Sequence, residues 1–214
     1  MVERLRIIHC FRAPVGGLFR HVLDLSGEQA ARGHEVGYVL DSTVSDPLTE
    51  QRLAKAATHL KLGITRLPDE GLAARRLRHE LPAAYRRLRE AADAHAIDTL
   101  WVPAYEGAHA DHDCANALAA ALLRERPAVA AWEFAEYNNA GGTKRANEFF
   151  DVRGGETAVA LEDDMEGRWK THLLRLYRSE AFNLRIVSAG KTAFRESFRP
   201  LPPHDYARPP HEGR

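Results

Sequence analysis

Short apolar runs alternate with amphipathic stretches along the chain, and this alternation predicts strands separated by helices. Residues 5–10, 34–40, 98–103, 128–133 and 157–161 are typical of strands, while 60–67 is apolar but irregular and leaves a short strand open. Helical periodicity covers 18–31, 49–59, 72–95 with a break at Pro82, 112–124 and 162–177. The first strand, Gly-rich turn, helix and second strand form a βαβ unit, which predicts an α/β fold with a parallel sheet.

Composition and charge narrow the class of protein. The 214 residues suit one large domain or two small ones. Thirty basic side chains balance thirty acidic ones, so nothing in the charge predicts a nucleic-acid partner. Cys10 and Cys114 form no CxxC pair, which favours a reduced, cytoplasmic compartment. The N-terminus does not match a signal peptide, and no apolar run is long enough to predict a membrane span.

The chemistry that stands out is the run His109-Ala110-Asp111-His112-Asp113, which follows the strand predicted at 98–103. Two imidazoles three residues apart, with carboxylates beside them, suit a metal-assisted hydrolase, because zinc binds neutral imidazole nitrogens and carboxylates next to a reactive water. The alternative is the first turn of a helix in which the histidines are incidental.

The N-terminal part of the chain, residues 1–67, resembles the start of retaining GT-B glycosyltransferases. The segments that carry the resemblance are Phe11-Arg12-Ala13-Pro14-Val15-Gly16-Gly17-Leu18-Phe19-Arg20-His21-Val22, Gln29-Ala30-Ala31-Arg32-Gly33-His34-Glu35-Val36-Gly37 and Asp41-Ser42. The resemblance implies that Gly16 and Gly17 approach a sugar or phosphate at a helix N-terminus, although the same pair also suits a tight turn. A complete GT-B enzyme needs a second domain that 214 residues cannot hold, so this part predicts at most a binding module for a sugar nucleotide or glycan.

Residues 62–214 resemble the PIG-L/LmbE-like family of zinc-dependent N-deacetylases. Five segments carry this resemblance in family order: Leu67-Pro68-Asp69-Glu70-Gly71-Leu72, Pro103-Ala104-Tyr105-Glu106-Gly107-Ala108-His109-Ala110-Asp111-His112-Asp113, Tyr137-Asn138-Asn139-Ala140-Gly141-Gly142, Tyr177-Arg178-Ser179 and Tyr206-Ala207-Arg208-Pro209-Pro210-His211. It implies a Rossmann-like three-layer sandwich with a mostly parallel sheet and a hydrolase of carbohydrate metabolism. The implied substrate is an N-acetylglucosamine-type sugar, a glycoconjugate or a related amide.

The same resemblance assigns roles to individual residues. His112 would bind zinc, while His109 would stabilise the tetrahedral oxyanion or protonate the leaving amine. Asp111 would orient a neighbouring imidazole, as acids behind metal ligands do. Tyr137 and Asn138 are candidate substrate contacts, although asparagine in this segment also suits a turn.

The chain departs from the family after the first strand, where a His-Pro-Asp-Asp-Glu-like run would supply two zinc ligands and the base. Here the strand ends Ile8-His9-Cys10-Phe11-Arg12-Ala13-Pro14, and no acid follows before Asp24. His9 is the candidate second ligand by position; the alternative is a hydrogen-bonded histidine at a strand end. We therefore expect an impaired deacetylase.

The two resemblances meet near residues 62–64. We expect a glycosyltransferase-like segment at 1–65 and a deacetylase segment at 66–214, packed as one domain. The rival hypotheses are a non-catalytic binding module and a joined chain without activity. The oligomeric state is left open by the sequence.

Overall fold

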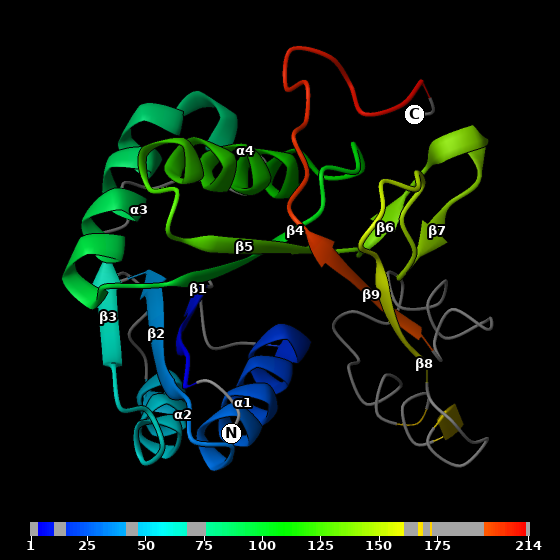
Figure 1. Cartoon of the computed structure of the whole chain (residues 1–214). Helices are drawn as coiled ribbons and strands as arrows, with labels where there is room; N and C mark the ends of the chain where they lie inside the picture. Colours follow the sequence, from blue (N-terminus) through cyan, green and yellow to red (C-terminus); the bar gives the residue numbers. More distant parts are fainter. Residues whose placement is uncertain are drawn as a thin grey trace. The chain divides into compact units, whose positions relative to one another are not determined.

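The computed structural model describes residues 4–10, 16–41, 47–67, 76–160, 167–168, 172 and 195–212. Helices and strands alternate through most of this part, as Figure 1 shows. In chain order the elements are β1 (Arg6–Cys10), α1 (Gly16–Ala31), β2 (Glu35–Asp41), α2 (Pro47–Ala57), β3 (Gly63–Leu67), the 3-10 helix η1 (Leu77–His79), α3 (Leu81–His95), β4 (Thr99–Pro103), α4 (Ala110–Glu125), β5 (Ala130–Phe134), β6 (Tyr137–Asn138), the 3-10 helix η2 (Ala140–Gly142), β7 (Arg145–Ala146), β8 (Thr157–Ala160) and β9 (Arg195–Pro200).

The elements confirm the α/β class predicted from the sequence. The chain divides into two compact units, the first formed by Met1–Leu72 with Arg86–Leu100 and the second by Ala73–Tyr85 with Trp101–Arg214. Most of the helix predicted at 162–177 lies outside the described residues. Within the described part of the chain, no helix has the length and apolarity that crossing a membrane requires.

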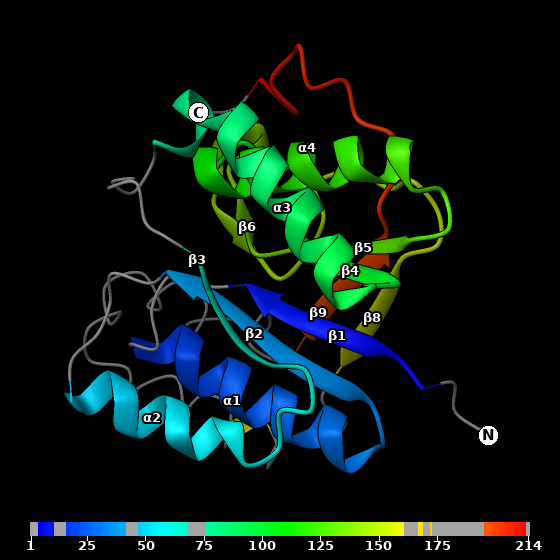
Figure 2. The same ribbon diagram turned by 90° about the vertical axis from the view of Figure 1, so that its left-hand side faces the viewer.

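The first unit is built on a parallel sheet in the order β1-β2-β3. Figure 2 shows α1 and α2 against the same face of this sheet. Buried side chains of β2 meet those of the two helices in one core cluster, whose members are Val22, Val36, Tyr38, Leu40, Leu53, Ala56 and Leu60. The alternation of apolar strand and amphipathic helix in the sequence is therefore explained by burial of one face of each helix on the sheet.

Strand β2 passes so close to the chain before β3 that glycine is required at position 37. A Cβ atom on Gly37 would lie 2.8 Å from the Leu62 Cβ atom and 3.2 Å from the Gly63 carbonyl oxygen. We expect Gly37→Ala to lower the free energy of unfolding by about 1–3 kcal/mol, because the strands must separate to admit the methyl group. Urea denaturation followed by circular dichroism measures this loss.

Gly27→Ala is the matched control for that substitution. Gly27 lies inside α1, and a Cβ atom there would meet nothing within 4 Å. Alanine in a helix interior is better than glycine by about 0.5–1 kcal/mol, so this variant should be more stable than the wild type. A Gly37→Ala protein as stable as Gly27→Ala would contradict the close approach at β2.

The second unit contains a sheet in the order β4-β5-β9-β8 and a small hairpin of β6 and β7. Strand β9 pairs antiparallel with both β5 and β8. The sequence did not predict β9, and it predicted a loop where β6 forms its two-residue pairing with β7. Both differences arise from pairing partners distant in sequence or separated by a Gly-rich turn, which local periodicity does not reveal.

Candidate active site

The run from His109 to Asp113 forms the start of α4, immediately after the loop that leaves β4. His109 is the N-cap residue: its backbone is extended, and its Nδ1 accepts a hydrogen bond of 3.2 Å from the Asp111 backbone N–H. Asp111 and Asp113 lie in the first turn, where carboxylates interact favourably with the positive end of the helix dipole. The Asp111 carboxylate also accepts a hydrogen bond of 3.2 Å from the Leu77 backbone N–H, which ties η1 to this turn.

The two imidazoles of the run are stacked on each other. Their ring centroids are 4.4 Å apart, with 26° between the ring planes. The Tyr137 ring stands edge-on to His112 at 5.9 Å, and a Glu136 carboxylate oxygen lies 3.2 Å from the His112 Nδ1 atom. The structure thus brings together His109, His112 and Tyr137 from the sequence-predicted site and adds Glu136.

The partners of the two rings fix which nitrogen carries the proton. Because His109 Nδ1 accepts a hydrogen bond, the neutral ring holds its proton on Nε2 and is a donor there. The carboxylate beside His112 Nδ1 favours the opposite tautomer, with the proton on Nδ1 and a lone pair on Nε2. The stacked pair therefore offers one hydrogen-bond donor and one base.

Burial keeps His112 available as a base at neutral pH. Desolvation lowers the pKa of His112 below its ordinary value, and the negative charges of Asp113 and Asp111 offset part of this effect. A neutral imidazole with a low pKa can accept a proton without first losing one.

Asp113 holds the loop that precedes the histidines. Its Oδ1 accepts hydrogen bonds from the backbone N–H groups of Glu106 and Gly107, at 3.1 and 3.0 Å. Burial raises the pKa of Asp113, and these two hydrogen bonds counteract the rise. Gly107 has a φ of 72° and a Cβ atom there would meet Pro210 at 2.9 Å, so glycine is required at this turn.

Glu106 is a buried carboxyl that the sequence reasoning missed as a functional residue. It is 4% exposed, and its Oε2 accepts hydrogen bonds from the backbone N–H groups of Glu136 and Tyr137 at 3.0 and 3.1 Å. Burial raises the pKa of Glu106 to about 7, although the hydrogen bonds from the 136–138 segment oppose the rise. Glu106 therefore positions the segment that carries Glu136 and Tyr137.

The two candidate substrate contacts on β6 lie in different surroundings. The Asn138 side chain is fully buried, and its amide nitrogen donates to Glu106 Oε1 at 3.4 Å and to the Glu148 carbonyl oxygen at 3.0 Å. Tyr137 is half-buried, and the Lys144 ammonium lies 4.4 Å from the centre of its ring. The surroundings of Tyr137 thus suit contact with a ligand better than those of Asn138, and both substrate roles stay predictions.

The candidate ligand His9 belongs to the first unit. Its Nε2 lies 2.7 Å from the Gln29 side-chain oxygen, and its ring meets Tyr38 edge-on at 6.1 Å. Among the described side chains, no three of the His, Cys, Asp or Glu type come together as a cation would require. The described residues therefore do not fit the zinc site that the family resemblance implies, since such a site needs at least three protein ligands.

Gly16 and Gly17 are the first two residues of α1, so the helix begins two residues before the predicted start. Residues 11–15, which carry part of the glycosyltransferase-like motif, lie outside the described residues. A role for the glycine pair in binding a sugar or phosphate stays a prediction.

The second unit also contains a buried polar cluster that the sequence did not predict. Glu133 on β5 and Arg199 on β9 are buried and joined by a hydrogen-bonded ion pair of 2.7 Å. His204 Nε2 lies at hydrogen-bond distance, 3.0 Å, from the other Glu133 oxygen. Burial favours the neutral acid, but the His204 hydrogen bond and the Arg199 charge outweigh it and hold the pKa of Glu133 below its ordinary value.

Comparisons with known proteins give structural likenesses alone. No protein-family model and no curated protein matches the chain. An A40926 pseudoaglycone deacetylase has 14% sequence identity and a TM-score of 0.47, with 92% of this chain and 97% of that one covered.

Two further solved structures give similar values. A deacetylase of teicoplanin biosynthesis, in complex with teicoplanin, has 13% identity and a TM-score of 0.49 over 91% of this chain and 97% of its own. A conserved protein from Thermus thermophilus has 18% identity and a TM-score of 0.48 over 94% and 97%. At such identities and TM-scores, the function of this chain has to be argued from its own residues.

Proposed function

We propose that the stacked histidines form the site of a PIG-L-like N-deacetylase acting on N-acetylated amino sugars or related glycoconjugates, with impaired activity. The observation that carries the proposal is the pair of contacts at His109 Nδ1 and His112 Nδ1, which favour opposite tautomers and make one ring a donor and the other a base. Amide hydrolysis needs both functions, because a water must lose a proton as the carbonyl oxygen gains negative charge. The resemblance of the His109–Asp113 run to the second signature of the family supports the same activity.

The chemistry can be assigned to side chains of this unit. His112 Nε2 takes a proton from water as the water oxygen bonds to the amide carbon, and the Glu136 carboxylate stabilises the resulting imidazolium. His109 Nε2–H donates to the oxyanion of the tetrahedral intermediate. The proton held on His112 then passes to the amine as the C–N bond breaks, which gives acetate and a free amino sugar.

Zinc is implied by the family resemblance, and no step above depends on it. In the part of the chain that the structure describes, His112 does not belong to a group of three possible metal ligands, and the sequence lacks an acidic run after its first strand. We therefore expect slow turnover, since a positioned base alone contributes about 10²–10⁴-fold to a rate. The resemblance implies a Rossmann-like single-domain sandwich, which we expect here. The zinc dependence that it also implies is not carried over to the proposed reaction, because the described residues do not form a three-ligand site.

Replacement of His112 by Ala is expected to abolish release of amine from an N-acetylglucosamine derivative. Glu136→Gln should lower kcat by about 10–100-fold, because a hydrogen bond to a charged group is worth about 1.5–3 kcal/mol and the amide cannot stabilise the imidazolium as a carboxylate does. In the wild type, kcat should rise with pH through a midpoint below the ordinary pKa of histidine, since desolvation lowers the pKa of His112. Fluorescent detection of the free amine measures each rate.

Glu125→Gln, on the exposed end of α4, is the matched control for Glu136→Gln and should leave the rate unchanged. Metal analysis of the dialysed protein is expected to find zinc well below one equivalent. Full zinc occupancy with rapid turnover, both lost in His112→Ala, would contradict the impairment. Equal rates of amine release in the wild type and His112→Ala would refute the proposal of a deacetylase at this site.

A further inference from the structure

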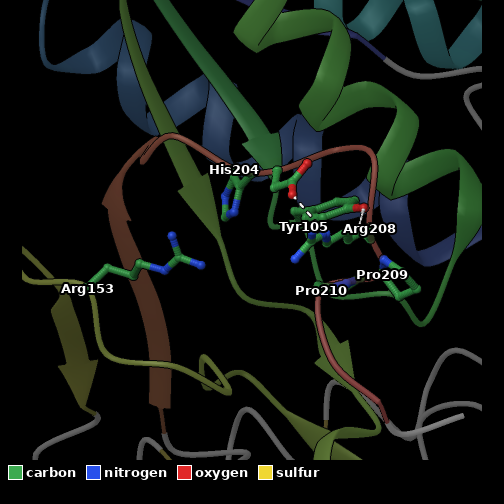
Figure 3. A pocket seen from close by; sticks show the side chains of 7 residues that line it. Tyr105, Arg153, His204, Arg208, Pro209 and Pro210 are labelled. Carbon is green, nitrogen blue, oxygen red and sulfur yellow. Dashed lines mark hydrogen bonds and ion pairs between the residues drawn. The ribbon is translucent and has the colours of Figure 1, made fainter.

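A pocket of about 250 Å³ opens in the second unit and contains none of the histidine-site residues. Figure 3 shows Arg153 and His204 on one side of it and Tyr105, Arg208 and two prolines on the other. Its lining residues are Tyr105, Arg153, His204, Asp205, Arg208, Pro209 and Pro210. A space of this size is below the range of drug-sized ligands and suits a small polar molecule.

His204 offers this pocket a fixed hydrogen-bond acceptor. Its side chain is 2% exposed, and Nε2 donates to a Glu133 carboxylate oxygen at 3.0 Å. That carboxylate also accepts from Arg199 and Asn116, which hold it in place and ionised. Because the Glu133 carboxylate accepts from Nε2, the Nδ1 atom of the neutral His204 ring carries the lone pair that a ligand hydroxyl can donate to.

The charges around the pocket are balanced. Arg153 pairs with Asp151 and also donates to the Pro203 carbonyl oxygen at 3.2 Å. Arg208 is highly exposed and lies 3.5 Å from the Asp205 carboxylate. Each guanidinium thus has a carboxylate partner, although Arg153 shares Asp151 with Arg199, so the pocket offers donors and acceptors together rather than a concentrated positive charge. Such a lining favours an uncharged ligand with several hydroxyl groups over an anion.

The remaining wall is apolar and well anchored. The Tyr105 ring packs against the rings of His204 and Tyr206 at 5.4 and 5.0 Å, and its hydroxyl donates to the Arg208 carbonyl oxygen at 2.6 Å. Pro210 lies against Gly107, at the turn where a side chain would not fit. An aromatic ring and two prolines present C–H-rich surface, which matches the less polar face of a sugar ring.

We propose that this pocket binds one uncharged pyranose ring, as a carbohydrate subsite additional to the histidine site. The Asp205 carboxylate and His204 Nδ1 would accept from sugar hydroxyls, while Arg153 and Arg208 would donate to them. Tyr105 and the prolines would cover the ring. The proposal does not depend on deacetylation, because neither His109, His112 nor Glu136 lines the pocket.

The test titrates N-acetylglucosamine into the full-length His112→Ala protein, so that no hydrolysis takes place, and follows binding by calorimetry or NMR. Saturable binding with a Kd on the order of millimolar is expected, as for a single small polar ligand. Arg208→Ala and Asp205→Asn, each made in that background, should weaken binding at least fivefold. Asp205→Asn keeps the oxygen that accepts from the Ala207 N–H, so the local turn is preserved.

Arg124→Ala is the matched control, since Arg124 is an exposed arginine on α4 that does not line the pocket. It should bind N-acetylglucosamine as the parent protein does. Undiminished binding in both pocket variants would overturn the proposal, as would no binding in the parent. Inorganic phosphate that displaces the sugar, or binds more tightly than it, would show an anion site and would also overturn it.

Discussion

Arg199→Met is expected to lower the free energy of unfolding of the second unit by about 3–5 kcal/mol. Glu133 is 0% exposed and Arg199 1% exposed, so the substitution leaves a carboxylate in the interior without the guanidinium that pairs with it. Arg199 also donates to Asp151 and lies 4.0 Å above the Phe149 ring, contacts that methionine replaces in part. Urea denaturation followed by tryptophan fluorescence measures the loss, since Trp101 and Trp132 belong to this unit.

The pH dependence of this loss identifies its cause. Without Arg199, burial is expected to raise the pKa of Glu133 above its unfolded-state value. The folded variant then holds a proton that the unfolded chain releases, so the deficit should shrink as the pH falls towards 5. A deficit that stays the same at every pH would indicate lost packing rather than an uncompensated charge.

Two further variants separate the charge from the side chain. Arg145→Met removes an exposed arginine whose ion pair with Glu148 is 3.9 Å long, and it should cost less than about 1 kcal/mol. Glu133→Gln combined with Arg199→Met should recover part of the stability, because the two substitutions are coupled through one contact. A double variant that is no more stable than Arg199→Met alone would contradict the explanation that an uncompensated Glu133 charge causes the loss.

The second large effect is expected from Glu106, whose pKa is raised to about 7 by burial. In the unfolded chain the pKa of Glu106 has its ordinary value of 4.5. Between pH 4.5 and about 7 the folded protein therefore binds more protons than the unfolded chain does. The stability contributed by protonated Glu106 is therefore complete below pH 4.5 and is lost as the pH rises to about 7. Since each tenfold difference in proton affinity is worth about 1.4 kcal/mol, the loss is about 3 kcal/mol.

Glu106→Gln should remove this dependence, because glutamine imitates the protonated acid and keeps an oxygen for the Glu136 and Tyr137 N–H groups. The stability of the variant relative to the wild type is expected to increase by about 3 kcal/mol from about pH 4.5 to about pH 8. Glu125→Gln, on the exposed end of α4, should show no such trend. Parallel pH profiles for the wild type and Glu106→Gln would refute the raised pKa.

Local sequence patterns were sufficient to predict the helices and strands that bury one hydrophobic face. Strand β2 and helix α1 were predicted almost to their ends, because apolar residues and Gly33 mark them in the sequence. Strand β9 was missed because its six residues include Arg195, Glu196 and Arg199, which do not suggest a buried strand. The burial of Arg199 depends on Glu133, which lies 66 positions earlier in the chain.

In the candidate site too, local sequence patterns predicted some residues, while others depend on partners that are distant in the chain. The run His109–Asp113 was recognisable because its chemistry lies within five consecutive residues at a helix start. The sequence did not reveal Glu136, Glu106 or His204, because the role of each depends on a partner that only folding brings near. No local spacing identifies a single glutamate as the partner of a distant histidine.

The place of β9 between β5 and β8 has a consequence for synthesis on the ribosome. Its residues, Arg195–Pro200, are translated well after β5 and β8, yet both of these strands pair with β9. Until β9 emerges from the ribosome, β5 and β8 have open edges where other chains can add as strands. The second unit must therefore complete its sheet late in translation, and nascent or prematurely terminated chains are the form of this protein most prone to aggregate.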